Sequence, residues 1–210
     1  MESRFWVSLI VIAIVSYLFA GLNGAIIASK LFHHEDIRTK GSGNPGFTNY
    51  KRVYGNGIVS WSVLLFDVGK TALCVWLSAM YMKDTFDLWH FGAAFSGLMC
   101  MLGHCCPVGY SLKGGKAFMA GFATTWFVDW RMALIAMVVF FTVLYLLRYM
   151  SVASCTASLT CPIVLYILGP ESFSVWLLCL LSALLVIVRH KSNFIKLMNH
   201  EESTFSIKKS

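Results

Sequence analysis

The chain has 210 residues, of which 58% are hydrophobic and only 13% are charged, with a formal net charge of +7. Soluble domains carry about 25% charged residues, so the composition excludes an ordinary soluble domain and favours a polytopic membrane protein. The apolar runs are continuous rather than alternating, which argues against a β-barrel. In a membrane protein, positive charge holds loops on the cytoplasmic side, so we do not expect nucleic-acid binding.

Long apolar runs predict an all-α helical bundle that forms one transmembrane domain over residues 1–210. A straight span needs about 20 apolar residues. The runs cover approximately residues 5–29, 58–82, 88–108, 117–128, 132–147, 152–168 and 172–188. The fourth run is short, and Asp129 and Arg131 separate it from the fifth. The sequence leaves open whether these two runs are two short helices or one broken helix.

The positions of Lys and Arg predict the number of spans and their orientation. Basic residues are concentrated in the loop 30–52, in the segment 111–116 and in the tail after residue 188, which includes Lys208 and Lys209. Seven spans place these three segments on one side, whereas six would move the tail to the poorly charged side. The positive-inside rule therefore predicts about seven spans, with the amino terminus outside and the carboxyl terminus in the cytoplasm.

The first polar loop reads GSGNPGFTNYKRVYGNG over residues 41–57. Glycine tolerates positive φ, so such a loop can turn backbone N–H groups toward one concavity that binds an anion. The planar guanidinium of Arg52 suits a phosphate group. The loop also holds four polar side chains: Ser42, Asn44, Thr48 and Asn49. An ordinary flexible linker is the alternative.

Two later segments also combine polar residues with cations. Residues 103–116 read GHCCPVGYSLKGGK, and the alternative here is a basic turn that only orients the chain. Residues 189–197 read RHKSNFIKL, with His190, Asn193 and Lys196. The alternative there is a basic patch for anionic lipids.

Two ionisable residues, Asp67 and Lys70, lie within the second apolar run. Their spacing of three places them on one face of a helix. Ionisable groups inside a span are costly and are usually functional, for example in the relay of a transporter. A mutually neutralising pair that packs helices together is the alternative.

Several familiar catalytic and metal-binding patterns are missing from the sequence. Gly69, Lys70 and Thr71 end like a phosphate-binding P-loop, but Leu64 stands where that motif requires glycine. There is no G-x-S-x-G elbow and no histidine with an aspartate five positions later. His104-Cys105-Cys106 lacks a second ligand pair at zinc spacing, so we expect no metal.

Five segments together resemble the motifs of one enzyme family. They are GSGNPGFTN, LFDVGK, GHCCPVGYSLKGGK, RYMSVAS and HKSNFIKL. They are similar to GSGNPGATN, LFDxxKG, GHxxPVFxxFKGGKG, RYxSLxS and HRxNIxRL of the bacterial acyl-phosphate:glycerol-3-phosphate acyltransferases, the PlsY family. The resemblance covers nearly the whole chain and rests on five separate segments in this order.

This resemblance implies a seven-helix enzyme of the bacterial inner membrane whose motifs face the cytoplasm. It implies transfer of a fatty acyl group from acyl phosphate to the 1-hydroxyl of glycerol 3-phosphate, without a cofactor. The products would be lysophosphatidate and phosphate, in the first step of phospholipid synthesis. The expected partners are these substrates and membrane lipids; the sequence indicates no particular protein partner. The alternative is a divergent non-catalytic paralogue, or a transporter that binds phosphorylated lipids or metabolites.

The same resemblance implies the residues of the site. The expected catalytic residues are Arg52, Lys113, His190 and Asn193. The expected phosphate-binding residues are Gly41, Ser42, Gly43, Asn44, Thr48, Asn49, Gly114, Gly115, Lys116, Ser151 and Ser154. Cations and backbone donors would stabilise charge on the carbonyl oxygen and the departing phosphate. The base is either His190 or a substrate phosphate oxygen, and the resemblance favours the phosphate.

The chain departs from the family pattern at several positions. Ala117 and His200 stand where glycine is usual, Phe47 replaces an alanine and Lys191 replaces an arginine. If the backbone at residue 117 needs a positive φ, alanine is expected to be strained there. These changes are compatible with a divergent enzyme or with a paralogue that binds without turnover.

Overall fold

The computed structural model describes residues 2–169 and 172–205, so Lys208 and Lys209 of the sequence argument lie outside the described residues. Within these ranges all regular structure is helical. The α-helices are α1 (Glu2–Ala20), α2 (Gly24–His33), α3 (Phe47–Tyr54), α4 (Ile58–Phe86), α5 (Trp89–Cys105), α6 (Phe118–Val128), α7 (Trp130–Leu147), α8 (Met150–Leu168), α9 (Phe173–Arg189) and α10 (Lys191–Met198). Two short 3-10 helices, η1 (Ile37–Thr39) and η2 (Val108–Tyr110), lie in the loops.

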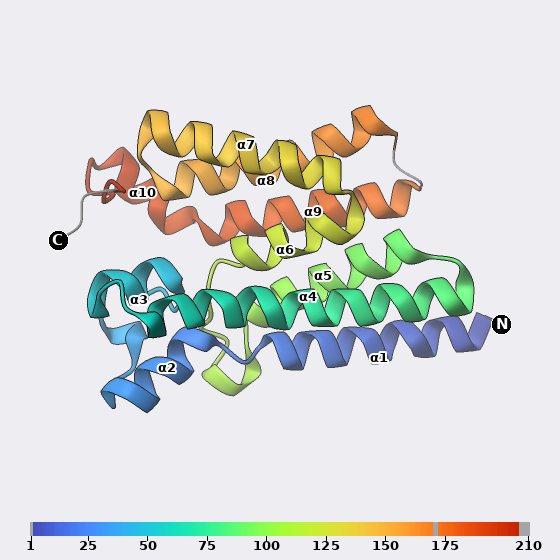
Figure 1. Cartoon of the computed structure of the whole chain (residues 1–210), viewed down its shortest axis with the longest axis horizontal. Helices are drawn as coiled ribbons and strands as arrows, with labels where there is room; N and C mark the ends of the chain where they lie inside the picture. Colours follow the sequence, from blue (N-terminus) through green and yellow to red (C-terminus); the bar gives the residue numbers. More distant parts are fainter. Residues whose placement is uncertain (1, 170–171, 206–210) are drawn as a thin grey trace.

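The long helices form two groups that run side by side, as Figure 1 shows. Helices α1, α4 and α5 pack together in one group, and α7, α8 and α9 in the other. The short helix α6 contacts both groups. This arrangement confirms the predicted all-α bundle.

Five helical segments of the described chain are long and apolar enough to cross a membrane. They are Glu2–His33, Ile58–Phe86, Trp89–Tyr110, Trp130–Leu147 and Met150–Leu168. Helices α9 and α10 meet at 48° and give a sixth if they are counted as one broken span. Helix α6 has only 11 residues. The predicted count of seven spans and the orientation of the termini therefore stay predictions.

The fourth and fifth apolar runs are two helices rather than one broken helix. Asp129 separates them, and its carboxylate accepts hydrogen bonds from the backbone N–H groups of Arg131 at 2.8 Å and Met132 at 3.3 Å. This is an N-cap, which satisfies amides that the first turn of α7 leaves unpaired. The interruption that the sequence placed at Asp129 is thus the start of a new helix.

The first apolar run is also divided, which its composition did not indicate. Helix α1 ends at Ala20, and Asn23 caps α2 by accepting a hydrogen bond from the N–H of Ile26 at 3.0 Å. The break turns the chain at the end of the bundle where α3 and α10 also lie (Figure 1).

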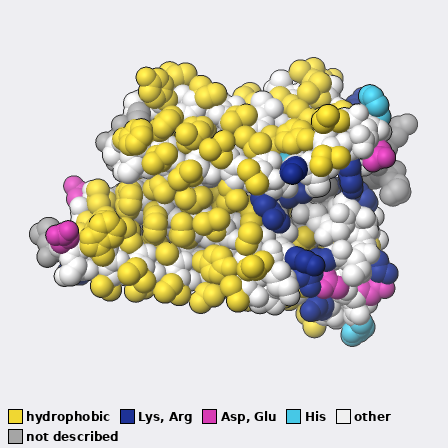
Figure 2. Space-filling model, turned by 180° about the vertical axis from the view of Figure 1, so that it is seen from behind, with side chains coloured by type: hydrophobic (Ala, Val, Ile, Leu, Met, Phe, Trp, Pro, Cys, Tyr) yellow, Lys and Arg dark blue, Asp and Glu magenta, His cyan; other side chains and the backbone are white. Residues whose placement is uncertain are grey.

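Charge and hydrophobicity divide the surface of the molecule. Figure 2 shows hydrophobic side chains over most of one face, while Lys and Arg gather at one end. Leu65, Ile167 and Phe173 are each at least 70% exposed. Such a broad exposed apolar surface suits a bundle surrounded by lipid.

Both positions where the chain replaces a usual glycine have a left-handed backbone. The φ angle is 56° at Ala117 and 58° at His200. Ala117 is buried at the N-cap of α6, where its side chain makes no capping hydrogen bond. The condition for strain at residue 117, a positive φ, is therefore met.

We expect Ala117→Gly to stabilise the protein, because the left-handed conformation costs an L-residue about 1–2 kcal/mol. The greater freedom of glycine in the unfolded chain offsets about 0.4–1 kcal/mol of this gain. A higher midpoint of thermal unfolding of the detergent-solubilised protein checks the prediction. Ala120→Gly, inside α6, is the matched control and should lower the midpoint. Equal losses of stability in both variants would show that the left-handed backbone at Ala117 is not strained.

Candidate active site

The first glycine loop, residues 40–46 and here called loop one, is folded around a side chain of α3. Asn49 is buried; its Oδ1 accepts a hydrogen bond from the Ser42 N–H at 2.9 Å, and its Nδ2 donates to the Lys40 carbonyl at 3.1 Å. Gly41 has φ 56°, and a Cβ there would lie 2.4 Å from Asn49 Oδ1. Gly43 also has a positive φ, 73°. Asn49 and these glycines therefore shape the loop, and Ser42 is exposed at its surface.

The second glycine loop, residues 106–117 and here called loop two, lies against the end of α5. The N–H groups of Gly114 and Gly115 donate to the carbonyls of Cys105 at 3.1 Å and His104 at 3.0 Å. A Cβ at Gly114 would lie 2.1 Å from the His104 carbonyl oxygen, so close approach of two backbones requires glycine here. These two amides are engaged within the protein, so the structure does not present them as anion donors.

Arg189 fixes loop two from the other side. Its Nε donates to the Gly115 carbonyl and its Nη2 to the Gly114 carbonyl, each at 3.1 Å. The guanidinium therefore satisfies two carbonyls with its planar fork. This contact places Lys116, the next residue, between α5 and the junction of α9 and α10.

Lys116 and Asn193 form the centre of the polar cluster. Lys116 Nζ donates to Asn193 Oδ1, and Asn193 Nδ2 donates to Glu202 Oε1 at 2.6 Å. Burial lowers the pKa of Lys116 to about 8, and the nearby Glu202 carboxylate partly opposes this by favouring the ammonium form. The site thus holds a cation that is poorly solvated, which favours contact with an anion.

His190 lies at the junction of α9 and α10 and is buried. Its Nδ1 lies 2.8 Å from the Val186 carbonyl. A carbonyl only accepts hydrogen bonds, so this contact assigns the hydrogen to Nδ1. In the neutral ring Nε2 is then the nitrogen that can accept a proton.

Ser151 and Ser154 lie in the first turns of α8 and are both buried. Ser151 Oγ has no hydrogen-bond partner among the described residues. The start of a helix also carries unpaired N–H groups and a positive partial charge, which together favour an anion. An unpartnered hydroxyl at such a helix start suits a phosphate ligand.

The remaining predicted residues differ in their exposure. Asn44 and Thr48 are partly buried, whereas Lys113 and Arg52 are exposed. Arg52 Nη2 donates to Ser203 Oγ at 3.0 Å, in the segment that follows Glu202. The tail therefore connects α3 with the Lys116–Asn193 contact.

Loops one and two are also joined by an arginine outside the predicted set. Arg38 is held by Asp36 at 2.7 Å and donates from Nη1 to the Tyr110 carbonyl of loop two at 2.8 Å. The three polar segments thus lie at one end of the bundle, where Figure 2 shows the cluster of Lys and Arg.

Sequence reasoning missed three residues of this region: Arg38, Arg189 and Glu202. Arg189 was within a quoted motif, and its position beside His190 was a usable signal. Glu202 is an acid in a basic tail, which was also visible. Arg38 gave no signal, because its contact with Tyr110 joins residues 72 positions apart.

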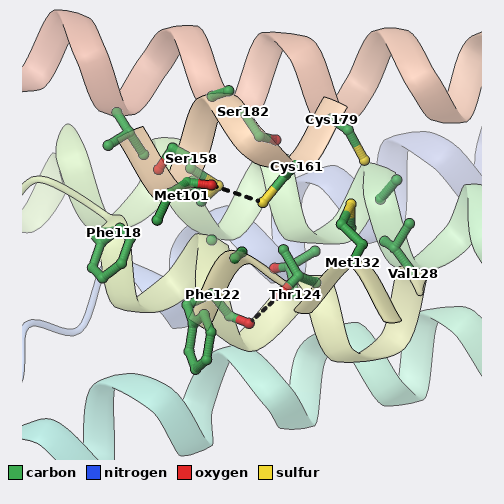
Figure 3. A pocket seen from close by; sticks show the side chains of 17 residues that line it. Met101, Phe118, Phe122, Thr124, Val128, Met132, Ser158, Cys161, Cys179 and Ser182 are labelled. Atoms are coloured by element: carbon green, nitrogen blue, oxygen red, sulfur yellow. Dashed lines mark hydrogen bonds between the residues drawn. The ribbon is translucent and has the colours of Figure 1, made fainter. Parts of the chain in front are cut away.

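An apolar cavity opens among α5, α6, α7, α8 and α9 (Figure 3). Its lining begins at Phe118 and Val186, close in sequence to Lys116 and His190, and extends to Val128 and Met132. The volume is about 40 Å³, so a long alkyl chain would enter only if lining side chains moved. Cations, unpartnered polar atoms and an apolar cavity together suit a ligand with an anionic head and a hydrocarbon tail.

Comparison with known proteins agrees with this arrangement. The family model described as glycerol-3-phosphate acyltransferase matches residues 10–200. A glycerol-3-phosphate acyltransferase of Finegoldia magna is 32% identical, with 93% of this chain and 95% of the relative aligned. One from Neisseria meningitidis serogroup C is 34% identical, over 90% of this chain and 93% of the relative.

Two solved structures have the same fold. Both are crystal structures of PlsY (YgiH), described as an integral membrane glycerol 3-phosphate acyltransferase. The glycerol 3-phosphate form has a TM-score of 0.84 and 28% identity, over 95% of this chain and 96% of that one. The lysophosphatidic acid form has a TM-score of 0.81 and 27% identity, with the same coverage. The chain therefore belongs to the PlsY family of integral membrane glycerol-3-phosphate acyltransferases.

Proposed function

We propose that this protein transfers a fatty acyl group from acyl phosphate to the 1-hydroxyl of glycerol 3-phosphate. The products are 1-acyl-glycerol 3-phosphate, or lysophosphatidate, and inorganic phosphate. The observation that carries the proposal is the contact of the partly buried Lys116 ammonium with Asn193, beside an apolar cavity. Family membership supports glycerol 3-phosphate as the acceptor. Acyl phosphate as the donor rests on the motif resemblance and on the number of anion-binding groups.

Two sets of groups suit the two phosphates. We assign to one phosphate the contacting pair Lys116 and Asn193, together with Lys113 of loop two and Ser151 at the start of α8. On the side of loop one and α3, the groups assigned to the other phosphate are Ser42, Asn44, Thr48 and Arg52. Gly41, Gly43, Asn49, Gly114 and Gly115 shape the loops, and Ser154, one turn after Ser151 on α8, is assigned to the same phosphate as Ser151.

The chemistry needs charge stabilisation more than a protein nucleophile. The C1 hydroxyl oxygen attacks the acyl carbonyl carbon, and the bond from that carbon to the phosphate oxygen breaks. Lys113, Lys116 and Arg52 stabilise the developing negative charge on the carbonyl oxygen and the leaving phosphate. The hydroxyl proton passes to a phosphate oxygen, so atoms and charge balance without a cofactor. His190 Nε2 is the second candidate for the base.

The apolar part of the molecule suits the acyl chain. We propose that the chain enters the cavity beside Phe118 and Val186, where each buried CH₂ gains about 0.8 kcal/mol. Met101 and Met132 line the cavity, and their flexible side chains can make room for it.

We further propose that the site faces the cytoplasm from the bacterial inner membrane. The cluster of Lys and Arg at the same end as the site supports this orientation through the positive-inside rule.

The transporter alternative loses its main support in the structure. Asp67 and Lys70 are paired at 2.7 Å, and Lys70 also donates to the Leu22 carbonyl. Both charges are therefore engaged in holding the backbone rather than lining a free path.

Lys113→Ala and Asn193→Ala should each lower turnover by at least about 100-fold, the usual loss when one charge-stabilising donor is removed. The measurement is phosphate release by purified protein in detergent with acyl phosphate and glycerol 3-phosphate. Lys83→Ala, an exposed lysine at the far end of α4, is the control and should keep wild-type activity. Wild-type protein that releases no more phosphate than the variants would count against the enzyme. Turnover with acyl-CoA and none with acyl phosphate would refute the donor.

The pH dependence of kcat/KM should reflect the protonation state of Lys116. Because burial lowers its pKa to about 8, the ammonium is present below that pH and is lost above it. We expect kcat/KM to fall above about pH 8, since the neutral amine binds phosphate poorly. In Lys116→Arg the fall should move beyond pH 9, because arginine stays protonated. Lys113→Arg is the control for an exposed lysine, and an identical shift in that variant would contradict the assignment.

Glu202→Gln tests how the tail acts on Lys116. Glutamine keeps a carbonyl oxygen for Asn193 Nδ2 but removes the negative charge that raises the pKa of Lys116. The fall of kcat/KM should therefore begin at a lower pH than in the wild type. Glu201→Gln, the neighbouring exposed acid, is the matched control. A profile unchanged in Glu202→Gln would show that the tail does not influence the site.

A further inference from the structure

We propose that Asp67, Lys70, Asn23 and His104 form a positioning network that sets loops one and two relative to each other during acyl transfer. The inference rests on the proposed function, because the activity reports the position of the loops. None of the four residues belongs to the phosphate-binding set. They act through the backbone of the loops and not by contact with substrate.

The centre of the network is a buried ion pair on α4. Lys70 Nζ lies 2.7 Å from Asp67 Oδ1, and the two side chains are 1% and 7% exposed. Lys70 also donates to the Leu22 carbonyl at 2.5 Å, and the Gly24 N–H lies 3.4 Å from Asp67 Oδ1. Each charge thus meets a backbone group that the break between α1 and α2 removes from helical pairing. A break at this depth is stable only if such groups are satisfied.

The first arm of the network leads from this break to loop one. Asn23 is fully buried within the break. Its Oδ1 caps α2, and its Nδ2 donates to the Pro45 carbonyl at 3.0 Å. Pro45 follows Asn44 in loop one. One side chain therefore ties the position of loop one to the helix break that the ion pair holds.

The second arm leads from Asp67 to loop two. His104 Nδ1 lies 3.9 Å from Asp67 Oδ1. Its Nε2 lies where a Cβ at Gly115 would be only 2.2 Å away, and its carbonyl accepts the Gly115 N–H at 3.0 Å. His104 Nδ1 has no hydrogen-bond partner among the described residues. His104 therefore lies beside Asp67 without a hydrogen bond to it and packs against the backbone of loop two on its other side.

One carboxylate oxygen is common to both arms. Asp67 Oδ1 is the atom near Lys70, Gly24 and His104. The two loops carry the groups assigned to the two phosphates, and a misplacement of about 1 Å between reacting groups can cost about 100-fold in rate. The buried carboxylate of Asp67 can therefore fix the position of loop one relative to loop two.

The test separates positioning from folding by using Asn23→Ser. Serine still caps a helix but lacks the N–H that donates to Pro45. We expect kcat to fall by about 10- to 100-fold, with a smaller fall of the thermal midpoint than in Asn23→Ala, because only the Pro45 carbonyl loses its partner. Asn23→Ala loses both contacts, so stability and kcat should fall together. Ser172→Ala removes the cap of α9 outside the network and should lower stability while leaving kcat of the folded protein unchanged.

His104→Asn supplies a second variant and a test of coupling. If both arms act through Asp67, kcat of Asn23→Ser/His104→Asn should fall by less than the product of the two single losses. Losses that multiply would show independent local effects and overturn the network. Folded Asn23→Ser protein with wild-type kcat would also overturn it, while the proposed function would stand. A wild-type protein without phosphate release would refute the proposed function itself.

Discussion

Backbone groups that leave a helix inside an apolar bundle must find partners within the protein. This constraint governs the region where the chain departs from regular helix. Lys70, paired with Asp67, donates a hydrogen bond to the break between α1 and α2. Arg189 donates to the carbonyls of loop two, and Asn49 donates to a carbonyl of loop one. Each irregular segment is thus held by a polar side chain from a neighbouring helix. The site is built where these held segments meet.

Holding the loops in this way leaves a different set of polar groups available for a ligand. The N–H groups of Gly114 and Gly115 already donate hydrogen bonds to carbonyls of α5. In contrast, the Lys116 ammonium is poorly solvated and the Ser151 hydroxyl has no hydrogen-bond partner among the described residues. Burying a cation costs free energy unless an anion compensates it. The polar groups that the scaffold leaves incompletely paired are therefore the ones that we propose bind phosphate.

The tail beyond α10 contacts two residues of the site. Glu202 contacts Asn193, and Ser203 contacts Arg52. The carboxylate favours the charged form of Lys116, which burial disfavours. The acidic tail thus partly offsets the effect of burial on Lys116.

The sequence by itself determined the class of the fold and the segments of the site. Continuous apolar runs predicted the helical bundle, because the interior of a membrane demands it. The glycine and cation motifs identified the loops, and the glycine usual at residue 117 indicated a left-handed backbone that Ala117 does adopt. Both signals are local, so they can be read from neighbouring residues.

Only the tertiary structure decided how these segments meet. The break at Asn23 could not be read from an apolar run, because it depends on charges of α4 that lie 44 and 47 residues further along the chain. The roles of Gly114 and Gly115 depend on their contact with the end of α5, which consumes the amides that the motif suggested as anion donors. The contacts of Arg38 and Arg52 likewise join residues far apart in sequence. Such pairings follow from the packing of whole helices, which no local pattern encodes.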